Sequence, residues 1–159
     1  MTEATAVDPG SLGALSAEGV IAHLGLEYLE GEGVWIRVLW RTDYANAIYC
    51  LLTPDGFSAL HRLREDEAWI HVAGAPVEQV VLAPDLAAGV TLISSELRHE
   101  AAVRVPAGCW QGARTTGEWS LVVCMLAPAF TGFELADAST DLAGWPAEAA
   151  GLARELIRA

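Results

Sequence analysis

Nine short segments rich in β-branched and aromatic residues follow one another along most of this chain, and they constrain its fold more than any other feature. The segments are VWIRVLW (34–40), NAIYCLL (46–52), FSALHRL (57–63), EAWIHVAG (67–74), VEQVVLAP (77–84), GVTLISS (89–95), AAVRVP (101–106), GARTTG (112–117) and WSLVVCMLAP (119–128). Gly, Pro, Asp and Asn residues separate them, as is typical of strands joined by turns. Many short strands at this spacing predict an all-β sandwich or barrel with antiparallel connections.

The chain is expected to form one domain, residues 15–159, behind a flexible tail over residues 1–14. Its 159 residues with 53% hydrophobic content suffice for one packed core. After the tail, SAEGVIAHLGL predicts a short helix that Ser16 opens and Gly25 ends.

The last part of the chain differs from the strand-rich middle. Residues 129–140, AFTGFELADAST, read as irregular. PAEAAGLARELIRA predicts a helix that begins at Pro146 and carries Leu152, Leu156 and Ile157 on one side. This helix is expected to cover the barrel or an edge strand.

Charge and hydropathy exclude two classes of partner. The net charge is −12, from 21 acidic and 9 basic residues. Nucleic acid is therefore not expected, because neutralising phosphates needs a surface of Lys and Arg. No apolar run reaches bilayer length, and the N-terminus has no secretion-signal pattern, so we expect no membrane partner and a cytoplasmic location.

The segment from residue 56 to 74 carries the most chemistry. If it forms two short strands joined by a tight acidic turn, alternation places Glu67, Trp69 and His71 on one face. Should His61 point into the same cavity, His61 and Glu67 become an acid/base pair or two metal ligands. The alternative is an ordinary hairpin whose His and charged residues face water.

Cysteine and arginine residues add two weaker candidates. Cys50, Cys109 and Cys124 show no metal-binding spacing and read as buried free thiols, although the turn that holds Cys109 can reach the cavity. Arg37 and Arg41 would share one face of a regular strand.

A guanidinium group there can hold the carboxylate or phosphate of a small ligand. An ion pair of Arg37 or Arg41 with Glu32 or Asp43 is the alternative reading.

Several ordered motifs resemble the cupin superfamily, in particular its small single-domain branch long known as a domain of unknown function. They are SxxHRxxxDExW from Ser58, VPAGxWQ from Val105 and SLVxxxxAPxF from Ser120, preceded by IYxLL and followed by FELAD. The resemblance implies a double-stranded β-helix, or jelly-roll barrel, with short N-terminal and C-terminal helices. It also implies a small-molecule ligand inside the barrel and a homodimer, for which the apolar VWIRVLW strand is the candidate interface.

Two of the four metal ligands usual in cupins are replaced in this chain. His61 and Glu67 keep their places, whereas Leu63 and Gln111 stand where the family has its other two His residues. A divalent metal held by His61, Glu67 and Gln111 stays open as an interpretation. One imidazole, one carboxylate and one amide oxygen are few ligands for a tightly bound metal, so we expect a site with no cofactor.

The resemblance implies that His61, Glu67 and Gln111 converge at one end of the barrel as catalytic residues. His61 and Glu67 would then move a proton on the ligand, and Gln111 would donate to an oxygen as charge develops. The candidate substrate-binding residues are Tyr49, Ser58, Trp69, His71, Cys109, Trp110 and Arg37.

These roles predict a metal-independent isomerase, epimerase, dehydratase or cyclase that acts next to a carbonyl in secondary metabolism. A metal-dependent oxygenase or decarboxylase and a non-catalytic ligand-binding protein are the alternatives, because one fold serves many chemistries. Trp69 and Trp110 can also be plain core residues, and His61 a histidine that only bonds Glu67.

Overall fold

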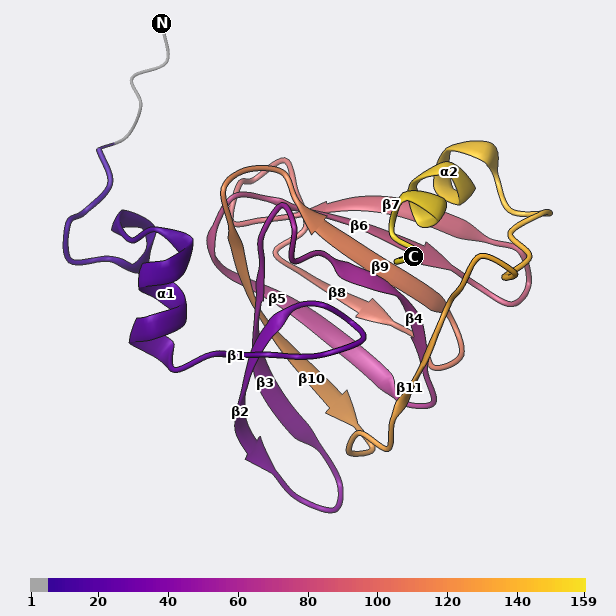
Figure 1. Cartoon of the computed structure of the whole chain (residues 1–159), viewed down its shortest axis with the longest axis horizontal. Helices are drawn as coiled ribbons and strands as arrows, with labels where there is room; N and C mark the ends of the chain where they lie inside the picture. The colour runs from indigo at the N-terminus through magenta and orange to yellow at the C-terminus, as the bar shows by residue number, and fades with distance from the viewer. Residues whose placement is uncertain (1–5) are drawn as a thin grey trace, which may run out of the picture.

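Two antiparallel β-sheets face each other across the core, and one helix lies against the outer face of each sheet (Figure 1). The computed structural model describes residues 6–159. The first sheet has the order β1-β2-β3-β10-β5-β8 and the second the order β11-β4-β9-β6-β7. The elements are η1 (Leu12–Ala14), α1 (Ala17–Leu24), β1 (Glu27–Tyr28), β2 (Trp35–Arg41), β3 (Asn46–Leu52), β4 (Ser58–Leu63), β5 (Asp66–Gly74), β6 (Val77–Leu82), β7 (Ala88–Ile93), β8 (Ala102–Val105), β9 (Trp110–Thr115), β10 (Ser120–Ala127), β11 (Phe133–Leu135) and α2 (Ala147–Glu155). This confirms the all-β jelly-roll architecture with one helix at each end of the chain.

Helix α1 begins and ends where the sequence predicts. The Ser16 hydroxyl accepts a hydrogen bond from the Gly19 amide at 3.1 Å, and Gly25 ends the helix with φ 63°, a left-handed conformation that glycine adopts without strain. Val20 of α1 packs with Leu51 and other apolar side chains on the outer face of the first sheet.

The expected flexible tail lies partly outside the described residues, which begin at residue 6. Of its other residues, Leu12–Ala14 form the short 3-10 helix η1, and Leu12 packs against the cluster beneath α1. The Trp119 indole N–H donates to the Leu15 carbonyl at 3.0 Å. The chain therefore joins the domain from Leu12 onward.

Helix α2 lies on the outer face of the second sheet, against β6 and the edge strand β7. Its Leu152 and Leu156 join a buried cluster with Leu60 and Leu82 of the sheet. The helix approaches β9 so closely that a Cβ at Gly112 would lie 2.9 Å from the Leu156 side chain. None of the helices within residues 6–159 has the length and apolar character that a membrane span needs.

The segment that reads as irregular in the sequence contains a strand. β11 pairs with β4 in an antiparallel register that sets Phe133 opposite Leu63 and Leu135 opposite His61. Three residues are too few to show a periodic pattern, and the pairing joins parts of the chain about 70 residues apart. Only the tertiary structure therefore reveals this strand, which brings Phe133 beside the candidate site.

The two chemistry-bearing strands β4 and β5 do not form a hairpin. β4 pairs with β9 and β11 in the second sheet, whereas β5 pairs with β10 and β8 in the first. The short link at Arg64 and Glu65 crosses from one sheet to the other, so the inner faces of both strands look into the same interior. His61 is 2% exposed and Glu67 is 5% exposed, and the water-facing hairpin is therefore wrong.

A β-bulge in β2 separates two arginines that were expected to share a face. Arg37 lies opposite Tyr49 and Arg41 lies opposite Asn46, with a shift in register between Val38 and Trp40. Because Tyr49 and Asn46 are three residues apart on β3, they point to opposite faces. Arg37 accordingly lies on the outer face and Arg41 on the inner face.

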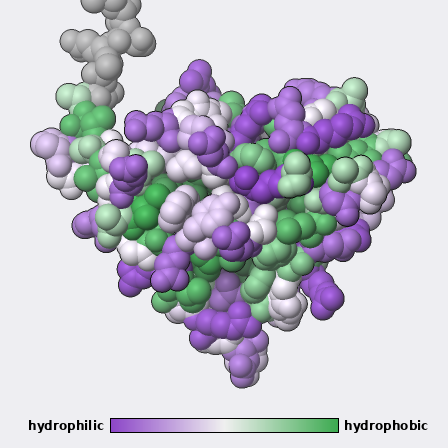
Figure 2. Space-filling view, in the orientation of Figure 1, coloured by the Kyte–Doolittle hydropathy of each residue, from purple (hydrophilic) through white to green (hydrophobic). Residues whose placement is uncertain are grey.

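Apolar side chains also reach the outer surface, where green patches are interrupted by purple hydrophilic ones (Figure 2). On β2, Leu39 is 39% exposed and Trp40 is 43% exposed. β1 pairs only with Trp35 and Ile36, so the backbone of residues 37–41 forms an open edge in the described part of the chain.

The contact between α2 and β9 predicts a destabilising substitution. Gly112→Ala places a methyl group against Leu156 and the Ser58 carbonyl, at 2.9 and 3.2 Å. We expect urea denaturation to show a loss of about 1–3 kcal/mol in the free energy of unfolding. The matched control is Gly151→Ala, where a Cβ meets nothing within 4 Å and a gain of about 1 kcal/mol is expected. Equal effects of both changes would contradict this close packing.

Candidate functional site

A small cavity of about 200 Å³ lies between the two sheets. Its volume is below the range of roughly 300–1,000 Å³ that is usual for sites binding drug-sized ligands. Its lining residues are Leu29, Glu32, Ile36, Val38, Arg41, Asn46, Ile48, His61, Leu63, Glu67, Leu126, Phe130 and Phe133. Polar groups are few and the walls are mostly aliphatic or aromatic, which suits a small molecule with a largely apolar body.

His61 stands in this cavity with one ring nitrogen engaged and the other available. Its Nδ1 lies 2.7 Å from the Ala59 carbonyl oxygen. Because a carbonyl only accepts, Nδ1 carries the hydrogen of the neutral ring, and Nε2 is left with its lone pair. Nε2 lies 3.9 Å from Oε1 of Glu32, so imidazole and carboxylate form a close pair.

Glu67 is a buried carboxyl group that other side chains hold in place. The Gln111 amide N–H donates to its Oε2 at 2.8 Å, and the Gln111 carbonyl oxygen accepts from the Trp69 indole N–H at 3.0 Å. The pKa of Glu67 is raised to about 7, and burial is the largest cause. His61 acts to lower this pKa, the negative charge of Glu32 to raise it, and the Gln111 hydrogen bond to lower it. Near neutral pH this carboxyl group exchanges readily between its two protonation states.

Glu32 is a residue of the site that the sequence analysis assigned elsewhere, as an ion-pair partner of Arg37 or Arg41. Its Oε1 accepts from the Ser58 hydroxyl at 2.6 Å and faces His61. Glu32 lies in a sharp turn between Gly31 and Gly33, whose φ angles of 89° and 88° require glycine. The Gly-Glu-Gly pattern is the sequence signal that points to this carboxylate.

The arginine side chains bind backbone carbonyls instead. Arg37 donates to the Leu24 carbonyl at 3.2 Å, near the end of α1, and Arg41 donates to the Phe130 carbonyl at 2.8 Å. The expected ion pairs with Glu32 or Asp43 do not form among the described residues.

Of the residues expected to be catalytic, the structure brings His61 and Glu67 to the cavity and sets Gln111 behind Glu67. Ser58 contacts the site through its hydrogen bond to Glu32. Gln111 is 1% exposed, and both ends of its amide are engaged by protein groups. Its geometry is that of a residue that positions Glu67.

Three expected pocket residues lie on outer faces of the sheets. Tyr49 and Arg37 face the α1 side of the first sheet. Trp110 packs with the α2 cluster and lies under the Arg62 guanidinium, whose carbon is 4.6 Å from the ring centre. Because Trp110 directly precedes the inward-facing Gln111, strand alternation turns it outward.

The other expected pocket residues lie inside the barrel but away from the cavity lining. Trp69 and Cys109 belong to the apolar core between the sheets. His71 is half-buried, with its Nε2 3.2 Å from the Ala75 carbonyl oxygen and its Nδ1 buried without a partner. The reading of Trp69 as a core residue therefore describes its place.

The sequence analysis did not name Asn46, Phe130 and Phe133, which lie with Arg41 at the far end of the cavity. Asn46 accepts from the Phe130 amide at 2.7 Å, and Arg41 donates to the Phe130 carbonyl. The two side chains thus hold Phe130 by both of its backbone groups, and the Phe130 and Phe133 rings form one wall.

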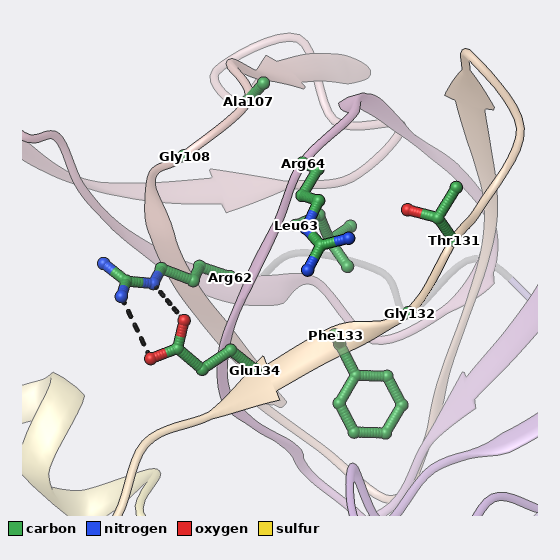
Figure 3. Close-up of a pocket in the computed structure, with 9 residues that line it drawn as sticks. All are labelled: Arg62, Leu63, Arg64, Ala107, Gly108, Thr131, Gly132, Phe133 and Glu134. Carbon is green, nitrogen blue, oxygen red and sulfur yellow. Dashed lines mark hydrogen bonds and ion pairs between the residues drawn. The ribbon is translucent and has the colours of Figure 1, made fainter.

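A wider groove of about 650 Å³ lies on the outside of the same wall. Its lining residues are Arg62, Leu63, Arg64, Ala107, Gly108, Thr131, Gly132, Phe133 and Glu134 (Figure 3). Phe133 and Leu63 line both spaces and separate the groove from the inner cavity. The Glu134 carboxylate is bound by the Arg62 guanidinium at 2.7 and 2.9 Å, so the available acid and base groups are those of the inner cavity.

The donor set does not fit the four-ligand metal centre that the cupin resemblance implies. In the Gln111 side chain only the carbonyl oxygen is able to bind a cation. This oxygen accepts a hydrogen bond from the Trp69 indole N–H. Leu63 offers no donor. Within residues 6–159, no group of three or more His, Cys, Asp and Glu side chains is arranged to hold a metal ion.

Two antiparallel sheets wound into a jelly roll around a small, partly polar cavity define a cupin-type barrel. The sequence profile described as Cupin superfamily (DUF985) matches residues 18–137, and the chain therefore belongs to the cupin superfamily. The comparison with curated proteins gives no significant match.

Solved structures support the same architecture. A hypothetical protein from Leishmania major is similar with a TM-score of 0.81 and 23% identity, over 91% of this chain and 100% of that one. A protein from Shewanella oneidensis is similar with a TM-score of 0.81 and 27% identity, over 91% of this chain and 98% of that one. Oxalate decarboxylase from Lactobacillus farciminis shares the fold over 71% of this chain and 34% of its own, with a TM-score of 0.57 and 12% identity.

The raised pKa of Glu67 predicts how stability depends on pH. The folded protein keeps a proton up to about pH 7 that the unfolded chain releases near pH 4.5. Stability from this group is therefore complete below pH 4.5 and is lost as the pH rises through about 7. The loss is about 3 kcal/mol, since each pKa unit corresponds to about 1.4 kcal/mol.

The measurement is urea denaturation of the wild type and of Glu67→Gln across this pH range. The variant lacks the titrating group, so its free energy of unfolding should not show this fall. Parallel curves for the two proteins would mean that Glu67 titrates normally.

Proposed function

We propose that this protein is a small-molecule enzyme that moves a proton at the carbon next to a carbonyl group, without a metal. Isomerisation, epimerisation, dehydration and cyclisation in secondary metabolism all use such a step. The observation that carries the proposal is a buried carboxyl group, Glu67, with a pKa of about 7, which faces an apolar cavity together with His61.

In this mechanism Glu67 takes the proton from carbon, because its carboxylate and carboxylic acid forms are both populated at neutral pH. His61, when protonated at Nε2, donates that proton to the carbonyl oxygen to give the enol, and takes it back as Glu67 returns its proton to carbon. Glu32 orients the His61 ring and stabilises its protonated form. Gln111 holds the Glu67 carboxylate in position, a supporting role in place of the oxyanion contact expected from the sequence.

Two other functions remain as outcomes of the test. A metal-dependent oxygenase or decarboxylase has less support here, because Trp69 already binds the Gln111 oxygen. A non-catalytic protein that binds a small ligand would use the same cavity without turning the ligand over.

The test is exchange of α-protons into D₂O, followed by NMR on a panel of small ketones and oxo acids. We expect Glu67→Gln and His61→Ala each to reduce exchange of a responsive compound by on the order of 10²–10⁴-fold. Exchange should be insensitive to a chelator. The matched controls are His23→Ala and Glu78→Gln, both remote from the cavity, which should retain the wild-type rate.

Undiminished exchange in both cavity variants would contradict the proposed roles of Glu67 and His61. Saturable binding of a compound with no exchange would support the binding protein instead. Loss of exchange with the chelator, restored by a divalent ion, would support the metal-dependent alternative.

A cytoplasmic location forms part of the proposal. Cys50, Cys109 and Cys124 are free and buried. Free thiols of this kind are typical of a reducing compartment, where disulfides are rare.

We further propose that two copies of the chain pair through β2. Residues 37–41 offer an unpaired backbone edge, with exposed Val38, Leu39 and Trp40 side chains beside it. An open apolar edge of this kind is typical of a strand that pairs with another chain.

Light scattering after size-exclusion chromatography tests the homodimer. The wild type should have the mass of two chains at micromolar concentration, and the double variant L39E/W40E should have the mass of one. Leu97→Glu, which changes a fully exposed leucine in a loop, is the control and should remain dimeric. A monomeric wild type would refute the dimer.

A further inference from the structure

One row of side chains crosses the first sheet from its open edge to the catalytic carboxyl group. Arg41 on β2 lies opposite Asn46 on β3, Asn46 lies opposite Leu126 on β10, and Leu126 lies opposite Glu67 on β5. All four side chains line the inner cavity. The row therefore has donors at one end, an apolar residue in the middle and an acid at the other end.

The donor end has unused hydrogen-bonding capacity. A guanidinium group has five N–H donors, and for Arg41 the described residues engage one, at the Phe130 carbonyl. Asn46 is 5% exposed, its carbonyl oxygen accepts from Phe130, and its NH₂ group has no acceptor among residues 6–159. These two side chains can bind one group with several acceptor atoms.

The charges of the cavity favour an anion bound at this end. Arg41 is the only Arg or Lys side chain in the lining, whereas Glu32 and Glu67 lie around His61. A negative group is attracted by Arg41 and repelled by the two carboxylates, so the charge pattern orients a ligand. A planar carboxylate matches the guanidinium fork.

The register also limits the length of the ligand. Asn46 and Glu67 are two strands apart, a backbone separation of about 10 Å. Both side chains reach into the gap, and Leu126 lies between them. A few methylene groups over Leu126 are enough to place a carboxylate at Asn46 and a carbonyl at Glu67.

We propose that Arg41 and Asn46 form a carboxylate-binding subsite and that the ligand is a small aliphatic oxo acid. Its carboxylate binds Arg41 and Asn46, its short chain lies on Leu126 and the phenyl wall, and its carbonyl reaches Glu67 and His61. The carbonyl position rests on the proposed function, whereas the carboxylate subsite does not.

The probes are 4-oxopentanoate, 5-oxohexanoate and 6-oxoheptanoate, with 5-oxohexanamide as the neutral isostere, titrated at millimolar concentrations by NMR. The best oxo acid should bind the wild type about tenfold or more tightly than the amide, since hydrogen bonds to charged groups are the strong ones. Arg41→Met should abolish this preference and leave binding of the amide unchanged. Arg41→Lys, which keeps the charge but loses the fork, should retain part of the preference.

Arg64→Met is the matched control, because Arg64 lines the outer groove and Arg41 lines the inner cavity. It should bind the oxo acids as the wild type does. Loss of binding in Arg64→Met with retention in Arg41→Met would overturn the proposal, as would equal affinity for acid and amide or no binding of any acid. Thermal unfolding of each variant separates lost binding from lost folding.

Proton exchange on the same oxo acids separates this subsite from the proposed function. Binding that depends on Arg41 without exchange supports the subsite and contradicts the catalytic roles. Exchange that Arg41→Met leaves unchanged supports the catalytic roles and overturns the subsite.

Discussion

Gln111 links the two sheets inside the barrel, and the geometry of the cavity depends on that link. Its amide extends from β9 in the second sheet to two residues of β5 in the first, donating to Glu67 and accepting from Trp69. Both contacts are buried, so each polar group satisfies another that would otherwise be costly to bury. Gln111 stands where the resemblance to cupins implies a histidine ligand, and in this structure its side chain supports Glu67.

The raised pKa of Glu67 follows from its burial between the two sheets. Glu67 stands among apolar side chains beside a second carboxylate, and burial is the largest cause of its raised pKa. The same enclosure brings His61, from the other sheet, within reach of Glu32. The two sheets thus bring together an imidazole from β4, a carboxyl group from β5 and the Glu32 carboxylate from the turn between β1 and β2.

Local sequence patterns and the cupin-like motifs together predict much of the fold and part of the candidate site. Helix boundaries at Ser16 and Gly25, the strand-rich middle, and the inward positions of His61 and Glu67 all follow from local pattern and from resemblance to cupins. The face of the sheet that a strand residue occupies depends instead on pairing between strands that are far apart in the sequence. Tyr49 and Trp110 are aromatic residues in strands, and which face they occupy depends on the register with their neighbours and on which helix covers the sheet.

Arg37 and Arg41 show most clearly what local pattern cannot reveal. Four residues apart in a regular strand, they would share a face; one bulge in β2 turns Arg37 toward α1 and Arg41 toward the cavity. A bulge depends on the partner strand and leaves little trace in its own residues.

The sequence by itself determined an all-β sandwich or barrel, because strand periodicity and turn residues act locally, and its motifs resembled those of the cupin jelly roll. Only the tertiary structure decided which carboxylates meet the imidazole and which arginine faces inward. Those contacts depend on the distance and register between strands that are far apart along the chain.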